Sequence, residues 1–378
     1  MNKKKLRVAT VFSGIGAPEQ ALKRMGIDYE IEFASDNGER LIDIDYEKEF
    51  SKVKSLSDQF EKKSYVDLLY KEKTKRTNFV KPSYLANYKI KDDFFYEDVK
   101  LLDGTDFENK IDLFVGGSPC QSFSIAGARG GFEDTRGTLF YDYCRLVKEI
   151  KPKVFVYENV FGVLNHDKGK TWETMKNVFS ELGYSFKYAI LNAKDYGIPQ
   201  SRRRLFVVGF KNSKSCDNFD FPKVITLSST MQDYLEDNAA IGTIKNVNGK
   251  LKQVDNTKGD PDEKYYLSPK LLKYCLSPGT KNFYHADAEI DLKIARALLS
   301  TMGNSHRASV NNYVITNGRV RALTIREAHR LMGFPDDYKI VVSKAQAYKQ
   351  AGNYIVVDVL MNLFESIFDA EDFKNGKN

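Results

Sequence analysis

The sequence has little cysteine and no long apolar run. Its 378 residues include only four cysteines, which lie far apart at positions 120, 144, 216 and 275. This spacing favours neither a disulfide framework nor a zinc site, so we expect a reducing compartment and no metal. The amino-terminal lysines are not followed by the apolar run of a signal peptide, and we expect no stretch to span a bilayer. A cytoplasmic protein without a membrane anchor is therefore expected.

The composition is that of an ordinary globular protein with a modest positive charge. Hydrophobic residues make up 42% and charged residues 29%, and a chain of this length can bury a core in one large domain that carries a smaller one. The formal net charge of +7 favours an anionic partner, although many proteins with such an excess do not bind nucleic acid. Charge alone therefore indicates little about function.

Strand and helix patterns alternate along much of the chain. Apolar, β-branched segments predict strands at residues 6–12, 29–34, 111–115, 154–157 and 205–210. Apolar residues recur every three or four positions within 139–150, 175–182 and 356–367, which predicts helices. This alternation predicts a doubly wound α/β sheet with its ligand crevice at the carboxyl ends of the strands.

Two stretches depart from the alternation. Residues 39–90 are lysine-rich and patchily helical, which favours an insertion at the edge of the sheet. Residues 211–318 are rich in Asn, Ser, Asp, Lys and turn residues, which predicts a second domain. The periodicity then returns, and the carboxyl-terminal helix is expected to pack back on the first domain.

A glycine loop follows the first predicted strand. Gly14 and Gly16 stand between this strand and a helix, where backbone N–H groups can approach a nucleotide-like ligand. Asp36 ends the second strand and can accept hydrogen bonds from ribose hydroxyls. A structural turn beside a surface acid explains the same residues. Glu19 occupies the position of a third dinucleotide-type glycine, which argues against a pyrophosphate and for a smaller adenosyl ligand.

Candidate reactive groups follow later strands. Cys120 comes after Gly116-Gly117-Ser118-Pro119, which brings its sulfur to the crevice, and Pro119 stiffens the backbone before it. Glu158 ends the next strand and is a candidate acid. Arginines fill positions 202–204. A buried inert cysteine, a surface acid and a solvated basic patch are the alternative interpretations.

Together these segments resemble the DNA (cytosine-5) methyltransferases, especially the compact bacterial enzymes of restriction-modification systems. The resemblance covers the first ~40 residues, 92–210, and 319 to the carboxyl-terminal helix. It rests on the following segments, in this order: FSGIGAPEQAL, GGSPCQSFSIAGARGGFEDTRGTLF, ENV, LNAKDYGIPQSRRRLFVVGF, RALTIREAHRLMGFPDDY and QAYKQAGNYIVVDVL.

The resemblance implies a Rossmann-like S-adenosylmethionine-dependent methyltransferase domain with a smaller target-recognition domain. Residues 1–210 would form the catalytic domain, 211–340 the target-recognition domain and hinge, and 341–378 the carboxyl-terminal helix that completes the catalytic domain. Carbon 5 of cytosine is a weak nucleophile, so a thiolate must first add to C6. Cys120 matches the family's nucleophile, Glu158 the group at N3, Arg202 the group at O2, and Arg204 a supporting arginine.

The resemblance also implies the contacts of S-adenosylmethionine and its product S-adenosylhomocysteine. Phe12 matches the residue that stacks on adenine, Asp36 the ribose acid, and Asp98 the acceptor of the adenine amino group. Three positions depart from the pattern: Asn37 replaces a larger residue over the adenine, Ala126 replaces a polar side chain, and Tyr354 replaces a serine. The complete set of matched cofactor contacts is Phe12, Ser13, Gly14, Ile15, Gly16, Asp36, Asn37, Asp98, Val99, Pro119, Leu139 and Asn353.

The implied substrate is a cytosine flipped out of double-stranded DNA. A monomer is expected, with a cognate restriction endonuclease as a functional partner in a bacterial or phage context. Residues 304–307 are polar enough to meet base edges, but a surface turn explains them equally well, and no base-reading residue is assigned. The alternatives are a tRNA cytosine methyltransferase, a catalytically silent DNA-binding module and, more distantly, a nicotinamide dehydrogenase.

Overall fold

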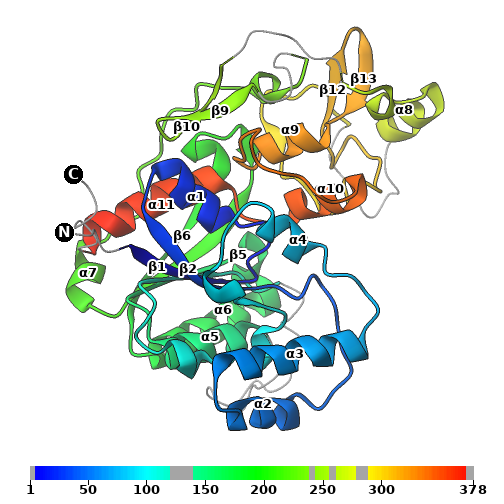
Figure 1. Cartoon of the computed structure of the whole chain (residues 1–378). Helices are drawn as coiled ribbons and strands as arrows, with labels where there is room; N and C mark the ends of the chain where they lie inside the picture. Colours follow the sequence, from blue (N-terminus) through cyan, green and yellow to red (C-terminus); the bar gives the residue numbers. More distant parts are fainter. Residues whose placement is uncertain (1–4, 120–138, 238–242, 255–260, 278–287, 372–378) are drawn as a thin grey trace.

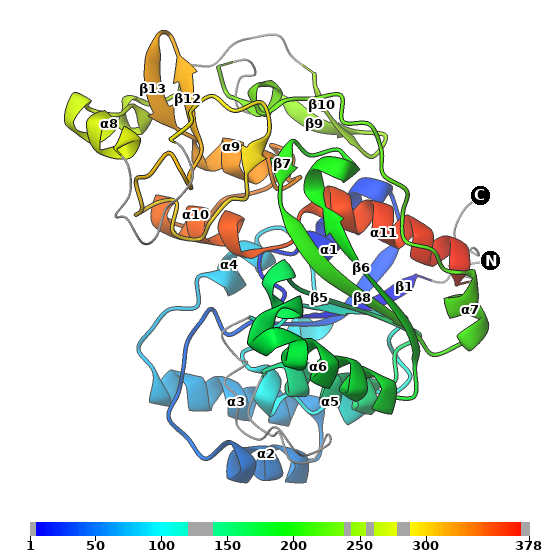
Figure 2. The same cartoon turned by 180° about the vertical axis from the view of Figure 1, so that it is seen from behind.

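The computed structural model describes residues 5–119, 139–237, 243–254, 261–277 and 288–371. Cys120 and Ala126, with the roles expected for them, lie outside these residues. Within the described part, a large α/β lobe carries a smaller lobe on one side (Figures 1 and 2).

A seven-stranded sheet forms the centre of the large lobe. Its neighbouring strands are parallel except β8, which runs antiparallel to both β5 and β6. The predicted doubly wound α/β sheet is confirmed. In spatial order the strands are β3 (Phe95–Tyr96), β2 (Tyr29–Ser35), β1 (Leu6–Val11), β4 (Leu113–Gly116), β5 (Val154–Val160), β8 (Arg203–Phe210) and β6 (Ser185–Asn192).

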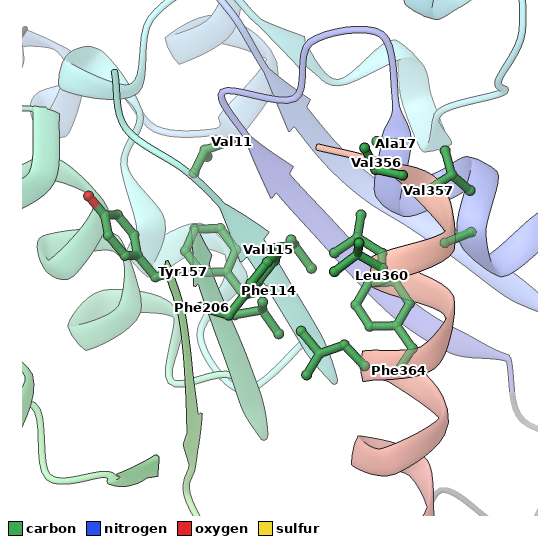
Figure 3. Close-up of a cluster of buried hydrophobic side chains, with 14 of the residues drawn as sticks. Val11, Ala17, Phe114, Val115, Tyr157, Phe206, Val356, Val357, Leu360 and Phe364 are labelled. Carbon is green, nitrogen blue, oxygen red and sulfur yellow. The ribbon is translucent and has the colours of Figure 1, made fainter. Parts of the chain in front are cut away.

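Helices cover both faces of this sheet (Figure 1). Helices α1 (Ala17–Met25) and α11 (Val357–Ala370) pack against each other on one face, and α5 (Leu139–Ile150) and α6 (Lys170–Glu181) lie on the other. The short α7 (Ser213–Asn218) packs on β6 and β8. Apolar side chains of α1 and α11 meet those of β4 and β8 in the core between the layers (Figure 3).

The carboxyl-terminal segment is long and apolar enough, by length and composition, to cross a membrane. That segment, Lys344–Ala370, is 56% buried in its most apolar window. It consists of two helices, α10 (Lys344–Asn353) and α11, and α11 buries its apolar face against α1 and the sheet. Packing into the protein core therefore explains its apolar character.

The insertion forms three helices, α2 (Tyr46–Ser55), α3 (Gln59–Lys73) and α4 (Val80–Leu85). Asp45 and Asp58 cap α2 and α3, because each carboxylate accepts backbone N–H groups of the first turn. Two short 3-10 turns, η2 (Val99–Leu101) and η3 (Gly104–Phe107), connect β3 to β4. A third, η1 (Lys91–Asp93), precedes β3. The insertion has a small apolar core of its own, made of Ile42, Val53, Val66, Leu69 and Tyr70 with Leu101 from η2.

The smaller lobe is built from hairpins and short helices. Both hairpin turns are Asn-Gly pairs with positive φ, at 248–249 and 317–318, as two-residue hairpin loops require. A parallel pair, β7 with β11, forms a separate two-stranded sheet and links the chain just before β8 to this lobe. The elements are β7 (Gln200–Ser201), β9 (Ile244–Val247), β10 (Lys250–Gln253), α8 (Pro269–Leu276), β11 (Ala295–Arg296), β12 (Tyr313–Thr316), β13 (Arg319–Ala322) and α9 (Ile325–Arg330).

Single 3-10 turns complete the chain in both lobes. They are η5 (Phe161–Leu164), η6 (His166–Gly169), η7 (Ala193–Tyr196), η8 (Met231–Tyr234) and η9 (Glu263–Tyr265).

Two buried ion pairs lie in and around α9. Arg321 contacts Glu327 at 2.8 Å, and Arg330 contacts Asp336 at 2.7 Å, with all four side chains inaccessible to solvent. Removing one partner of such a pair would leave an uncompensated buried charge, which costs about 3–5 kcal/mol. The structure around α9 therefore depends on both pairs remaining intact.

Candidate active site

The glycine loop after β1 is shaped by close neighbours. Gly14 and Gly16 have φ of 55° and 79°, in the left-handed region. A Cβ at Gly14 would lie 2.1 Å from the ring of Tyr354, and a Cβ at Gly16 would lie 2.2 Å from the ring of Tyr88. Phe12 also has a positive φ, of 52°, which is unusual for a bulky residue. Only glycine satisfies both backbone and space at positions 14 and 16.

Asp36 lies directly against this loop. Its Oδ2 accepts the N–H of Gly14 at 3.0 Å, and its Oδ1 accepts the N–H of Gly38 at 2.8 Å. Burial, with smaller effects of Glu39 and Glu97, raises the pKa of Asp36 to about 6. Each carboxylate oxygen retains a further lone pair, which a ribose hydroxyl can use.

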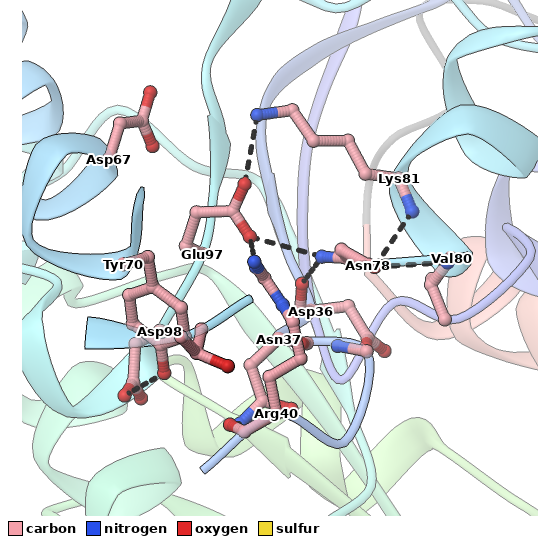
Figure 4. Close-up of polar contacts among 12 residues, drawn as sticks. Asp36, Asn37, Arg40, Asp67, Tyr70, Asn78, Val80, Lys81, Glu97 and Asp98 are labelled. Atoms are coloured by element: carbon pink, nitrogen blue, oxygen red, sulfur yellow. Dashed lines mark hydrogen bonds and ion pairs between the residues drawn. The ribbon is translucent and has the colours of Figure 1, made fainter. Parts of the chain in front are cut away.

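Asp98 follows β3, and Tyr70 lies against it (Figure 4). Burial raises the pKa of Asp98. The hydroxyl of Tyr70, from α3, donates to its Oδ2 at 2.6 Å, and the N–H of Lys100 donates to its Oδ1 at 3.0 Å. Asn37 forms a local turn instead of an adenine platform, because its side chain bonds the backbone of Glu39 and Arg40. Asp36 and Asp98 therefore stand as two carboxylates at the ends of neighbouring strands.

The other expected cofactor residues lie in varied surroundings. The hydroxyl of Ser13 bonds the backbone of Ser35, and Ile15 and Val99 are buried. Pro119 is exposed and Leu139 half-buried at the two ends of the undescribed segment. The side chain of Asn353 is exposed and donates to Glu39 at 3.0 Å, and Tyr354 beside it packs on Gly14.

The glycine loop and the two carboxylates suit a nucleoside. The N–H of Gly14 fixes Asp36 beside the loop, and the carboxylates of Asp36 and Asp98 keep lone pairs for hydroxyl and amino donors. S-adenosylmethionine carries donors of both kinds. The described residues therefore fit this cofactor.

Glu158 lies in the last part of β5 and faces the end of β4. The parallel register pairs Gly116 with Tyr157, so Gly117 comes next to Glu158. A Cβ at Gly117 would lie only 2.7 Å from Oε2 of Glu158. Burial raises the pKa of Glu158, while Arg204 and Arg202 oppose that rise. A raised pKa keeps the proton on the carboxyl up to a higher pH, as a group that donates a proton requires.

Arg204 is the arginine that contacts Glu158. Its Nε lies 3.0 Å from Oε1 of Glu158. The antiparallel register of β5 and β8 pairs Arg204 with Val160, which brings the two side chains together. The sequence resemblance had implied Arg202 for the group nearest the base.

Arg202 binds backbone carbonyl oxygens. It is 3% exposed, its Nη1 donates to the carbonyl oxygen of Leu298 at 2.9 Å, and its Nη2 donates to the carbonyl oxygens of Gly352 and Tyr354 at 2.9 Å each. These bonds join three segments that are distant in sequence. The guanidinium is thus turned toward backbone carbonyls, and Arg204 alone of the two lies within 3.0 Å of the carboxylate.

A buried polar network holds the segment before Cys120. The hydroxyls of Ser118 and Tyr157 lie 2.6 Å apart, and Nδ2 of Asn159 donates to the hydroxyl of Tyr157 at 2.8 Å and the carbonyl of Ser118 at 3.3 Å. Sequence analysis did not single out these residues. The available signal was polar side chains at the ends of two neighbouring predicted strands.

Gln200 is a further residue that sequence analysis missed. Its Oε1 accepts the N–H of Leu298 at 3.1 Å, and its Nε2 donates to the carbonyl of Leu331 at 2.8 Å. Together with the β7–β11 pairing, these bonds attach the arginine segment to the smaller lobe. The position of that segment therefore depends on both lobes.

Arg307 is engaged within the smaller lobe. Its Nη1 donates to the carbonyl of Tyr274 at 3.0 Å, and its Cζ lies 4.0 Å from the centre of the Tyr274 ring.

Among the residues that the structure describes, no group of three or more His, Cys, Asp or Glu side chains is arranged to hold a metal ion.

The fold and the site define a class of protein. The sheet with its reversed strand β8, the glycine loop after β1 and the acids after β2 and β3 form a Rossmann-like S-adenosylmethionine-dependent methyltransferase, as expected. The structure of S. pombe Dnmt2 methyltransferase has this fold, with a TM-score of 0.61 at 17% identity over 97% of this chain and 99% of that one. Entamoeba histolytica EhMeth is similar, with a TM-score of 0.61 at 17% identity, covering 97% and 98%.

The chain belongs to the C-5 cytosine-specific DNA methylase family, whose model matches residues 50–369. It is 37% identical over 269 residues to type II methyltransferase M.HhaI of Haemophilus parahaemolyticus, covering 70% of this chain and 77% of that protein. It is 35% identical over 308 residues to M.HpaII of Haemophilus parainfluenzae, covering 76% and 79%. The expected family and enzyme class, DNA (cytosine-5) methyltransferase, are confirmed.

Proposed function

We propose that the protein transfers a methyl group from S-adenosylmethionine to carbon 5 of a cytosine flipped out of double-stranded DNA, through a covalent bond between Cys120 and C6. The observation that carries this proposal is the pair formed by Glu158 and Arg204 against Gly117. From Gly117 the chain runs through two residues to Cys120. The Glu158 carboxyl and the Arg204 guanidinium therefore lie beside the start of the segment that carries Cys120.

The base end of the site can activate the pyrimidine. Attack of the Cys120 thiolate at C6 moves an electron pair toward N3 and O2 of the ring. Glu158, whose pKa is raised by burial, delivers a proton to N3. Arg204 donates hydrogen bonds to the developing charge at O2, and Arg202 positions the backbone around it. This exchanges the roles that the resemblance implied for the two arginines.

The cofactor end holds the methyl donor. S-adenosylmethionine supplies an electrophilic methyl group on a sulfonium, which C5 of the activated ring accepts. Asp36 binds the ribose hydroxyls, Asp98 accepts the adenine amino group, and the glycine loop lets the backbone approach the ligand. A base then takes the C5 proton, the C5–H electron pair forms the C5–C6 double bond, and the Cys120 thiolate leaves. Return of the N3 proton to Glu158 restores the neutral ring.

The smaller lobe serves target recognition in this proposal. A base inside a duplex is out of reach of any residue in the crevice, so the target must leave the stack at a cost of a few kcal/mol. The β7–β11 pairing and Gln200 couple the arginine segment to this lobe, which supports a role in DNA binding. We further propose a cytoplasmic monomer of bacterial or phage origin that protects DNA from a cognate restriction endonuclease.

Incubation with tritiated S-adenosylmethionine and either duplex DNA or tRNA tests the proposal. Label is expected in duplex DNA alone, and digestion should release it as 5-methylcytosine. Label in tRNA alone, or on an exocyclic nitrogen, would contradict the proposal. Bisulfite sequencing of plasmid from expressing cells would then identify the recognised sequence.

A further inference from the structure

Where the lysine-rich insertion meets the large lobe, carboxylates of the large lobe neutralise the charges of two of its lysines. Lys62 contacts Asp103 at 2.8 Å and Asp106 at 2.7 Å, and Lys81 contacts Glu97 at 3.0 Å. Charges that are paired in this way are poor contacts for DNA phosphates. This part of the insertion is therefore directed at the protein and not at a polyanion.

The insertion is attached at the carboxyl ends of β2 and β3 (Figure 4). Nδ2 of Asn78 donates to the carbonyl of Asp36 at 2.8 Å and to Oε2 of Glu97 at 3.1 Å. The guanidinium of Arg40 also binds the Glu97 carboxylate. These contacts join the insertion to the residues that flank both expected cofactor acids.

Tyr70 makes the most direct contact with one of those acids. It is 1% exposed and belongs to the small apolar core of the insertion. Its hydroxyl donates to Asp98 at 2.6 Å, and the guanidinium carbon of Arg40 lies 4.8 Å from its ring centre. Burial and the Asp98 charge raise the pKa of Tyr70, so the hydroxyl remains a donor.

We propose that the insertion is part of the cofactor site, and that Tyr70 is a positioning residue for adenine recognition. Tyr70 and the N–H of Lys100 each occupy one lone pair on a different oxygen of Asp98. Burial raises the pKa of Asp98, and these two hydrogen bonds oppose that rise. They also fix the carboxylate, with its remaining lone pairs available to the 6-amino group of adenine. The inference rests on the proposed function, because it assumes an adenosyl cofactor at Asp98.

This arrangement compensates for Asn37. The resemblance has a larger residue over the adenine at this position, whereas Asn37 forms a turn with Glu39 and Arg40. With less stacking surface, recognition depends more on the acceptor at Asp98. A site built to bond an amino group strongly rejects an analogue that lacks it.

Calorimetric binding of S-adenosylhomocysteine and its 6-deamino analogue tests the inference. The wild type is expected to bind S-adenosylhomocysteine roughly 30-fold more tightly than the analogue. Tyr70→Phe should weaken S-adenosylhomocysteine binding roughly tenfold and reduce the preference to about threefold. Because the preference is a ratio of two dissociation constants, a fraction of unfolded protein does not change it.

Tyr65→Phe is the matched control. Tyr65 lies on the same helix, and its hydroxyl bonds Glu49 within the insertion, away from Asp98. This variant should keep both the affinity and the preference of the wild type. A Tyr70→Phe protein with an unchanged preference, or an equal loss in the control, would overturn the inference. Failure of the wild type to bind S-adenosylhomocysteine at all would instead overturn the proposed function.

A second readout separates the cofactor site from a DNA surface. Duplex DNA affinity without cofactor should be the same for the wild type and Tyr70→Phe. A loss of DNA affinity larger than the loss of S-adenosylhomocysteine affinity would contradict the inference. Steady-state kinetics should show a raised KM for the methyl donor with little change in kcat.

Discussion

The two ends of the candidate site are organised differently. At the cofactor end, Asp36 and Asp98 each accept hydrogen bonds from two groups of the protein itself. At the base end, Glu158 forms an ion pair with Arg204 beside the segment that leads to Cys120. The two carboxylates of the cofactor end are thus held in place by hydrogen bonds within the protein. At the base end, Glu158 and Arg204 pair with each other, and a target base would contact both side chains.

Both ends contain a buried acid with a raised pKa, but the chemistry needs opposite protonation states. Asp36 must be ionised to accept ribose hydroxyls, and its pKa of about 6 permits this at neutral pH. Glu158 must hold a proton to deliver it to N3, and burial raises its pKa. The same desolvation therefore limits one function and supports the other. The predictions below test this contrast.

Replacing the acid at the base end should have the largest effect. Glu158→Gln keeps the shape of the side chain but cannot deliver a proton to N3, so single-turnover methylation should fall by roughly 100-fold or more. DNA and cofactor affinity should be retained, as measured by filter binding and calorimetry. An unchanged rate would remove Glu158 from the mechanism.

The two arginines should separate into a chemical and a structural role. Arg204→Met should lower the single-turnover rate by roughly 100-fold with little change in melting temperature, because it removes the cation beside the base. Arg202→Met should reduce the free energy of unfolding by about 3 kcal/mol, because three buried carbonyls lose their donors. Denaturant unfolding and rate measurements on both variants check this. The reverse pattern would restore the roles that the sequence resemblance implied.

A methyl group at Gly117 should disturb only the base end. Its Cβ would lie 2.7 Å from Oε2 of Glu158, so Gly117→Ala should displace the acid and lower kcat by roughly tenfold. S-adenosylhomocysteine affinity should stay within about twofold of the wild type. Gly162→Ala is the control, because no atom lies within 4 Å of the Cβ it would add. Equal effects of the two substitutions would contradict the placement of Glu158.

An effect of similar size is expected from pH at the cofactor end. The pKa of Asp36 is raised to about 6, so the carboxylate that binds ribose is lost as pH falls through that value. The dissociation constant of S-adenosylhomocysteine should rise roughly tenfold between pH 7 and pH 5. Asp36→Asn should bind more weakly at pH 7 and show a flatter profile. A wild-type affinity that is constant over this range would contradict the assignment.

Groups that directly follow predicted strands could be read from the sequence. The glycine loop, Asp36 and Glu158 lie at the carboxyl ends of β1, β2 and β5, and parallel strands bring these ends together. Strands β3 and β6 were not predicted. The first has two residues, and the second is an edge strand whose exposed and half-buried residues hide its period.

Contacts between distant segments could not be read from the sequence. The carbonyls that bind Arg202 come from residues 298, 352 and 354, so neither arginine's role follows from the local pattern. Tyr70 meets Asp98 from an insertion that the resemblance does not cover. Ser118, Tyr157 and Asn159 form a network only once β4 and β5 are paired.

The central claim, that a thiol adds to the pyrimidine, is tested most directly with duplex DNA that carries 5-fluorocytosine at the target. Fluorine replaces the proton whose loss releases the enzyme, so methyl transfer should trap a covalent complex that survives denaturation. The wild type should give this complex, and Cys120→Ala should give none while still binding S-adenosylhomocysteine. A trapped complex, or continued methylation of unmodified DNA, with the Cys120→Ala protein would contradict the account.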